Sequence, residues 1–124
     1  MPDVISTAPA DVRLWVALDV HRFLIVAAVL PPVGARPEVT RIETTEKAIR
    51  RFIKRLGGPQ GLAVSDEAGR GGFVLWRLLT SMGVACDVIA PSLVPVHAGD
   101  RVKTVRRDAK QLVGLFRGGL LRFV

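Results

Sequence analysis

Three acidic residues stand at positions where an acidic side chain is unusual and could do chemistry. Asp19 lies inside an apolar run at 13–20, Glu67 follows a short apolar segment at 62–65, and Asp108 borders the apolar stripe of a predicted helix. A carboxylate in a core-bound strand is costly to desolvate unless a cation, a metal ion or an amide group lies against it. Oxygen ligands gathered at one sheet edge would suit Mg²⁺ or Mn²⁺, and two such ions about 4 Å apart can promote phosphodiester chemistry. The three acids together predict a divalent-metal site at this edge.

Each acid also has a plain structural explanation. Asp19 would begin the turn of a hairpin, since Asp is common in turns. The pair Asp66 and Glu67 would lie at the start of a helix, where negative charge is favourable. Asp108 would pair with a neighbouring Arg or Lys. Taken one at a time the residues leave both interpretations open, and only their combination favours the metal site.

The strands that would position these acids are predicted from the hydrophobic pattern. Apolar runs at 13–20 and 23–30 are separated by only His21 and Arg22, which predicts an antiparallel hairpin. Residues 38–42 alternate between apolar and polar types and predict a third, edge strand. Asp19 would then lie near the end of the first strand.

From residue 44 onward the period changes from two to nearly four residues. An apolar stripe at 49–56 predicts a helix capped by Thr44 or Thr45. The remaining predicted elements are a strand at 62–65, a helix at 73–82, a strand at 84–89 and a last helix at 104–116. The order β-β-β-α-β-α-β-α predicts an α/β protein with a mixed sheet and helices on both faces, which is the order of the ribonuclease H-like fold.

Charge and composition favour a nucleic-acid partner for one compact domain. The 124 residues carry 18 Lys and Arg against 11 Asp and Glu, a net charge of +7 that suits a polyanion, although a basic small protein need bind nothing specific. A basic cluster on the first helix comprises Arg50, Arg51, Lys54 and Arg55. A solvated helix face explains that cluster more simply than a binding patch. The single cysteine, Cys86, fits the core of a cytoplasmic protein, and neither a signal peptide nor a membrane span is predicted. We expect a flexible arm at 1–12 and one domain at 13–124.

Four sequence motifs resemble those of a known family from about Leu14 to the end of the chain. They are Ala17-Leu18-Asp19-Val20-His21, Asp66-Glu67-Ala68-Gly69, Val88-Ile89-Ala90-Pro91-Ser92, and Gly99-Asp100-Arg101-Val102-Lys103-Thr104 leading into Arg106-Arg107-Asp108-Ala109. In these motifs the chain resembles the N-terminal, RuvC-like domain of the DEDD transposases of the insertion-sequence 110 group, together with the Piv/MooV invertases. The last motif is the most specific, because its order of charged and small residues is long and ungapped.

The resemblance implies a catalytic role for Asp19, Glu67 and Asp108 as ligands of Mg²⁺ or Mn²⁺. Val105 stands where the family pattern has a further Asp directly after Lys-Thr, so metal binding is expected to be weakened or lost. In the family pattern these two acids stand at i and i+3, which would place them on one helical face. A C-terminal domain with a nucleophilic serine, normal for the family, is not expected within this chain.

The family's activity is DNA transposition or inversion through metal-dependent strand cleavage and rejoining in a prokaryotic cell. The resemblance implies DNA as a partner and also a structured guide RNA, a homo-oligomer or a separate serine-domain chain. Residues expected to contact phosphates are Arg101, Lys103, Arg106 and Arg107. The alternative is a non-catalytic remnant that binds DNA or RNA, which Val105 and the end of the chain at Val124 favour, so enzyme activity stays open. An actin-like or sugar-kinase ATPase lobe is disfavoured, because no glycine-rich phosphate loop follows the first strand.

Overall fold

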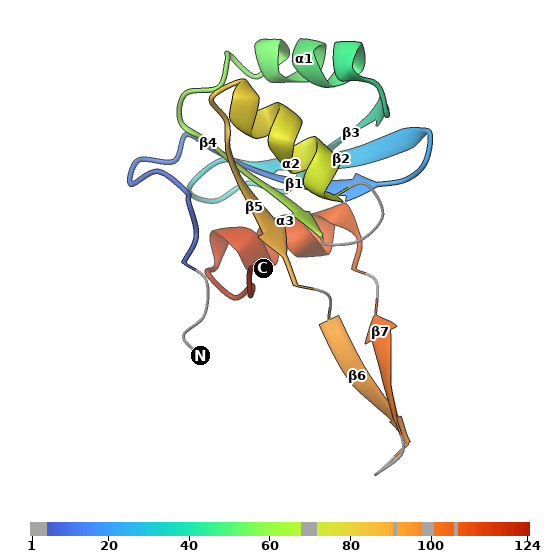
Figure 1. Cartoon of the computed structure of the whole chain (residues 1–124). Helices are drawn as coiled ribbons and strands as arrows, with labels where there is room; N and C mark the ends of the chain where they lie inside the picture. Colours follow the sequence, from blue (N-terminus) through green and yellow to red (C-terminus); the bar gives the residue numbers. More distant parts are fainter. Residues whose placement is uncertain (1–4, 68–71, 91, 98–100, 106) are drawn as a thin grey trace.

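The structure is a computed structural model of the chain (Figure 1). It describes residues 5–67, 72–90 and 107–124, together with the backbone of 92–97 and 101–105. Among these described residues, no helix is long and apolar enough to cross a bilayer.

A five-stranded mixed sheet forms the centre of the molecule. Its strands are β1 (Leu14–Val20), β2 (Leu24–Leu30), β3 (Glu38–Glu43), β4 (Leu62–Glu67) and β5 (Ala85–Ile89), in the spatial order β3-β2-β1-β4-β5. β1 pairs antiparallel with β2, and β2 with β3, whereas β1, β4 and β5 run parallel. This topology confirms the predicted ribonuclease H-like fold, with its hairpin and its edge strand. β4 extends beyond the predicted segment 62–65 and includes both Asp66 and Glu67.

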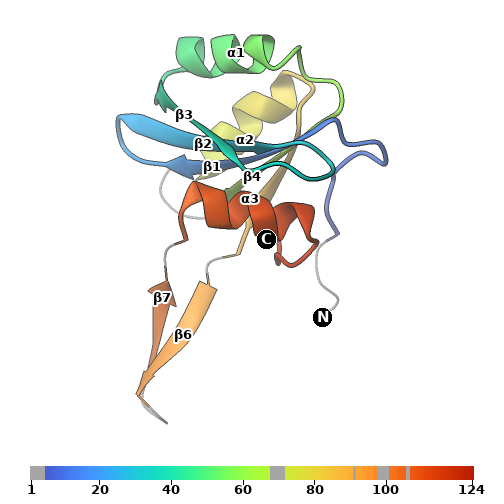
Figure 2. The same cartoon turned by 180° about the vertical axis from the view of Figure 1, so that it is seen from behind.

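Helices cover both faces of the sheet, as the sequence predicts. α1 (Glu46–Arg55) and α2 (Gly72–Ser81) lie on one face and α3 (Ala109–Arg117) on the other, which Figures 1 and 2 show from opposite sides. The Thr45 side chain accepts a hydrogen bond from the backbone N–H of Ala48 and caps α1, one of the two residues predicted to do so.

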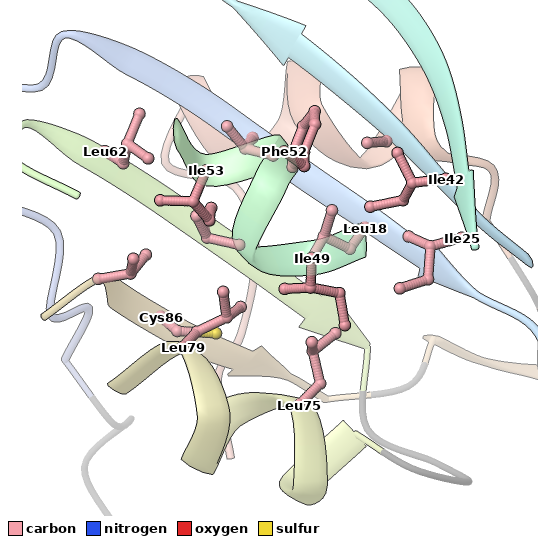
Figure 3. Close-up of a cluster of buried hydrophobic side chains, with 14 residues drawn as sticks. Leu18, Ile25, Ile42, Ile49, Phe52, Ile53, Leu62, Leu75, Leu79 and Cys86 are labelled. Carbon is pink, nitrogen blue, oxygen red and sulfur yellow. The ribbon is translucent and has the colours of Figure 1, made fainter. Parts of the chain in front are cut away.

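Two hydrophobic cores hold these layers together. The larger one lies between the sheet, α1 and α2, and Figure 3 shows its side chains converging from both layers. Cys86 is buried in it, as predicted. The second core lies beneath α3, where Trp15 and Phe116 meet edge to face with ring centroids 4.9 Å apart. Successive residues of a strand belong to opposite faces, so each strand position has a known side.

A hairpin replaces the predicted connection and the start of the predicted last helix. β6 (Ser92–His97) and β7 (Arg101–Val105) pair antiparallel as a separate two-stranded sheet that projects away from the main body (Figures 1 and 2). The predicted helix at 104–116 is therefore wrong at its start, because α3 begins only at Ala109. β-branched residues favour a strand before it, and the Asp108 carboxylate accepts a hydrogen bond from the Gln111 N–H at 2.8 Å, which fixes the helix start.

The outer edge of β5 is covered by residues from both ends of the described chain. The backbone N–H and the hydroxyl of Thr7 donate to the Asp87 carboxylate at 2.8 and 2.9 Å. At the other end, Ala90 N–H donates to the Arg122 carbonyl and Val124 N–H donates to the Val88 carbonyl, both at 2.8 Å. Part of the segment predicted as a flexible arm at 1–12 thus contacts the sheet, and its mobility stays a prediction.

Arg13 fastens the loop between α1 and β4. Its guanidinium donates to the backbone carbonyls of Leu56, Gly58 and Gln60 at 2.5, 3.2 and 2.9 Å. Because these carbonyls lie at an exposed site, we expect Arg13→Met to lower the free energy of unfolding by only about 1–2 kcal/mol. Urea denaturation would measure the change against Arg36→Met, which makes the same substitution at an exposed arginine in the loop between β2 and β3. Equal stability of the two variants would contradict a role for this clamp.

Candidate acidic site at the ends of β1 and β4

Asp19 and Glu67 lie side by side at the carboxyl ends of two parallel strands. The register pairs Leu18 of β1 with Asp66 of β4, so the next residues, Asp19 and Glu67, follow in step. Ala17 and Ala63 belong to the core beneath α3, and residues an even number of positions further along a strand share their face. Both carboxylates therefore face the α3 side of the sheet, where their side chains are only 15% and 18% exposed.

Arg107 approaches Glu67 from the segment before α3. Its Nη2 lies 3.4 Å from Glu67 Oε2 and donates to the Ala90 carbonyl at 3.1 Å, and the side chain is 15% exposed. This arginine, predicted to contact nucleic-acid phosphates, contacts a carboxylate of the candidate site in the free chain, and its phosphate contact stays a prediction. It neutralises part of the charge that Asp19 and Glu67 bring together.

His21 contacts the other carboxylate. Its Nε2 lies 3.1 Å from Asp19 Oδ2, and its side chain is 44% exposed. Sequence analysis missed this contact. The available signal was its spacing of two residues from Asp19, since such residues share a face of an extended strand.

Asp66 is a buried acid on the other face of the sheet. It continues the series Leu62 and Val64, which pack beneath α1 and α2, and it is 1% exposed. Its Oδ2 has no hydrogen-bond partner among the described residues. The pKa of Asp66 is raised from 3.8 to about 7, chiefly by burial and additionally by the negative charges of Glu67 and Asp19. A region of negative potential therefore extends through the sheet at the ends of β1 and β4.

Asp108 has a structural role as the N-cap of α3. It is exposed, and its carboxylate caps α3 through the Gln111 N–H. Val105 lies on β7, so the two positions do not share a helical face in this chain, contrary to the expectation from the family pattern. Arg101 and Lys103 also lie on β7, and Arg106 lies outside the described residues.

The donor set fits a magnesium ion only in part. Within the described part of the chain, no group of three or more His, Cys, Asp or Glu side chains could hold an ion. Mg²⁺, however, usually keeps several waters and binds proteins through one or two carboxylates together with substrate phosphates. Asp19 and Glu67 provide two such carboxylates on one face of the sheet.

Together, the mixed sheet and the paired carboxylates at the ends of its parallel strands define a ribonuclease H-like domain with an acidic edge. No family model matches the chain. It is 41% identical over 122 residues to y4qE of Sinorhizobium fredii (strain NBRC 101917 / NGR234), which is named as a transposase. It is 35% identical over 109 residues to the transposase for insertion sequence element IS1533 of Leptospira borgpetersenii. The alignments cover 94% and 85% of this chain but 31% of each relative, so the chain is related to transposases and spans about a third of their length.

Proposed function

We propose that this chain is a RuvC-like domain that acts in DNA transposition, in a transposase of the insertion-sequence 110 type. The observation that carries the proposal is the placement of Asp19 and Glu67 on one face at the ends of β1 and β4. The two transposase relatives support DNA as the substrate class. The remaining length of those relatives would supply the other parts of the reaction.

In this proposal the chain's own side chains prepare a site for Mg²⁺ or Mn²⁺. When bound, the metal would polarise a phosphodiester and stabilise its leaving oxygen. Asp19 and Glu67 would hold it, and His21 would keep the Asp19 carboxylate oriented through the 3.1 Å contact. Asp108, whose Oδ1 caps α3 through the Gln111 N–H, would have its second carboxylate oxygen to contribute. Arg101, Lys103, Arg106 and Arg107 would contact phosphates, and a guide RNA or a second subunit would be further partners.

The second candidate function is a domain that binds nucleic acid without cutting it. Three observations favour it: a valine at position 105, the Arg107 guanidinium beside Glu67, and the use of Asp108 as a helix cap. Each leaves fewer free oxygens for a metal ion. Both candidates place the chain on DNA, and they differ in whether a divalent cation binds at the acidic edge.

A metal titration separates the two candidates. We expect Mn²⁺ to raise the melting temperature of the wild-type chain by a few degrees, since a ligand that binds only the folded state stabilises it. Asp19→Asn should abolish this rise, because it removes one of the two ligands. Asp11→Asn is the matched control, since it makes the same chemical change at an exposed residue outside the sheet.

Differential scanning calorimetry with and without EDTA would make the measurement. An equal metal response in Asp19→Asn and Asp11→Asn would contradict the site. No response in the wild type, combined with metal-independent binding of DNA, would support the non-catalytic candidate instead.

A further inference from the structure

A basic hollow lies at the opposite edge of the sheet from β5. β3 is the edge strand there, and α1 packs against it. Between them is a hollow of about 360 Å³, and Glu43 is the one acidic residue among its described lining. Four basic residues line it: Arg41, Lys47, Arg51 and Arg55. We call this surface the basic hollow.

The structure divides the basic residues of α1 into two groups with different surroundings. Lys47, Arg51 and Arg55 are four residues apart, so they form one stripe about 12 Å long at 1.5 Å per residue. All three are exposed, and none of the ion pairs among the described residues involves Arg41, Lys47, Arg51 or Arg55. On the neighbouring stripe, Arg50 instead pairs with Glu46 at 2.9 Å. The interpretation of these residues as a solvated helix face therefore fits Arg50 better than it fits the residues of the basic hollow.

Arg41 of the basic hollow lies in the same cross-strand row as Asp19 of the candidate acidic site. Val26 of β2 pairs with Asp19 on one side and with Arg41 on the other, so the three residues form one row across the strands. At about 4.8 Å between neighbouring strands, Arg41 lies about 10 Å from Asp19 along this row. Val26 packs with the core beneath α3, so this row lies on the face opposite α1, and a polyanion bound in the hollow would reach the acidic edge only by passing around β3.

We propose that the basic hollow binds the sugar-phosphate backbone of a nucleic-acid duplex. Four like charges in one concave surface repel one another, and a polyanion relieves this repulsion. The 12 Å stripe matches about three to four nucleotides of one strand at 3.4 Å each. No aromatic side chain lines the described part of the hollow, so it offers contacts to phosphates and no stacking platform for unpaired bases.

Such contacts would hold the duplex in register without reading its sequence. The proposal draws DNA as a partner from the proposed function but needs neither a metal ion nor cleavage. It also differs from the predicted phosphate contacts at 101–107, because it rests on β3 and α1.

Two double variants test the proposal with the same loss of charge. Arg51→Ala/Arg55→Ala removes two cations from the basic hollow, and Arg50→Ala/Lys54→Ala removes two from the neighbouring stripe of the same helix. We expect the first to weaken binding of a fluorescent DNA duplex by about tenfold more than the second. It should also reduce the slope of log K against log salt by about 2, because each lost phosphate contact removes about 0.9.

Fluorescence anisotropy would measure binding to duplex DNA, duplex RNA, single-stranded DNA and polyglutamate, and circular dichroism would confirm folding of both variants. Equal losses in the two variants would overturn the proposal, since only net charge would then matter. Tighter binding of single strands, or binding of polyglutamate without duplex, would also overturn it. The proposed function and this inference can fail separately. If Asp19→Asn loses the metal response but Arg51→Ala/Arg55→Ala binds the duplex as the wild type does, this inference is overturned and the proposed function stands.

Discussion

Asp66→Asn is expected to raise the free energy of unfolding of the metal-free protein at pH 8 by up to about 4 kcal/mol. The carboxyl of Asp66 is buried, and its pKa rises from 3.8 to about 7 on folding. Each pKa unit corresponds to about 1.4 kcal/mol between the two protonation states. Asparagine carries no charge to desolvate, although its amide must still find partners, so the full gain is an upper bound.

The pH dependence of stability should change together with this substitution. Between pH 3.8 and about 7 the folded chain keeps a proton on Asp66 that the unfolded chain has lost, so wild-type stability falls as the pH rises through this window. In Asp66→Asn this contribution disappears. Urea denaturation at pH 5 and pH 8 in EDTA would measure it, with Asp11→Asn as the control for ordinary carboxyl titration. The prediction fails if Asp66→Asn and Asp11→Asn show the same pH dependence.

Arg107→Gln is expected to strengthen Mn²⁺ binding about tenfold and to lower the free energy of unfolding. The tenfold gain corresponds to about 1.4 kcal/mol of binding free energy. The guanidinium lies 3.4 Å from Glu67 Oε2, so a divalent ion must compete with it for that carboxylate. Removing it frees Glu67 as a ligand but leaves a largely buried negative charge without its cation. That loss should cost about 1–3 kcal/mol, less than for a fully buried pair, because both partners are partly exposed.

Arg117→Gln is the matched control for this experiment. Arg117 lies at the other end of α3 and donates to the carbonyls of Pro31 and Gly34 at 3.1 and 2.7 Å. Its replacement should lower stability without changing Mn²⁺ affinity. Calorimetric titration of both variants would show whether the gain in affinity is specific to Arg107. An unchanged affinity in Arg107→Gln would mean that the guanidinium and the metal do not compete.

Most of the fold could be predicted from the sequence, because its signals are local. Two apolar runs separated by His21 and Arg22 require a hairpin, and an apolar stripe at 49–56 with a threonine cap requires a helix. The hairpin of β6 and β7 was missed. Its β-branched residues at 101–105 favour a strand, but they are followed closely by an apolar stripe of helical period, and the predicted helix at 104–116 extends back into them.

The candidate site was predictable only where strand periodicity determines the face of a residue. Alternation along β1 places Asp19 on the α3 side, and the parallel register brings Glu67 beside it. Alternation also separates Asp66 from Glu67, although they are neighbours in sequence. The contact of Arg107 with Glu67 depends on how the chain enters α3, which involves residues 40 positions apart and has no local signal.

The two edges of the main sheet are protected in different ways, and this affects how copies of the molecule could aggregate. At the end of β5, the Val88 carbonyl and the neighbouring Ala90 N–H are bonded to residues 122–124, which blocks pairing of another strand there. β3 has no neighbouring strand on its outer side, but it presents Glu38, Arg41 and Glu43 to solvent. Charged side chains on an exposed edge oppose pairing with a second chain. One edge is thus protected against fibril formation by a covering segment of chain and the other by charge alone, which makes β3 the edge more sensitive to neutralising substitutions.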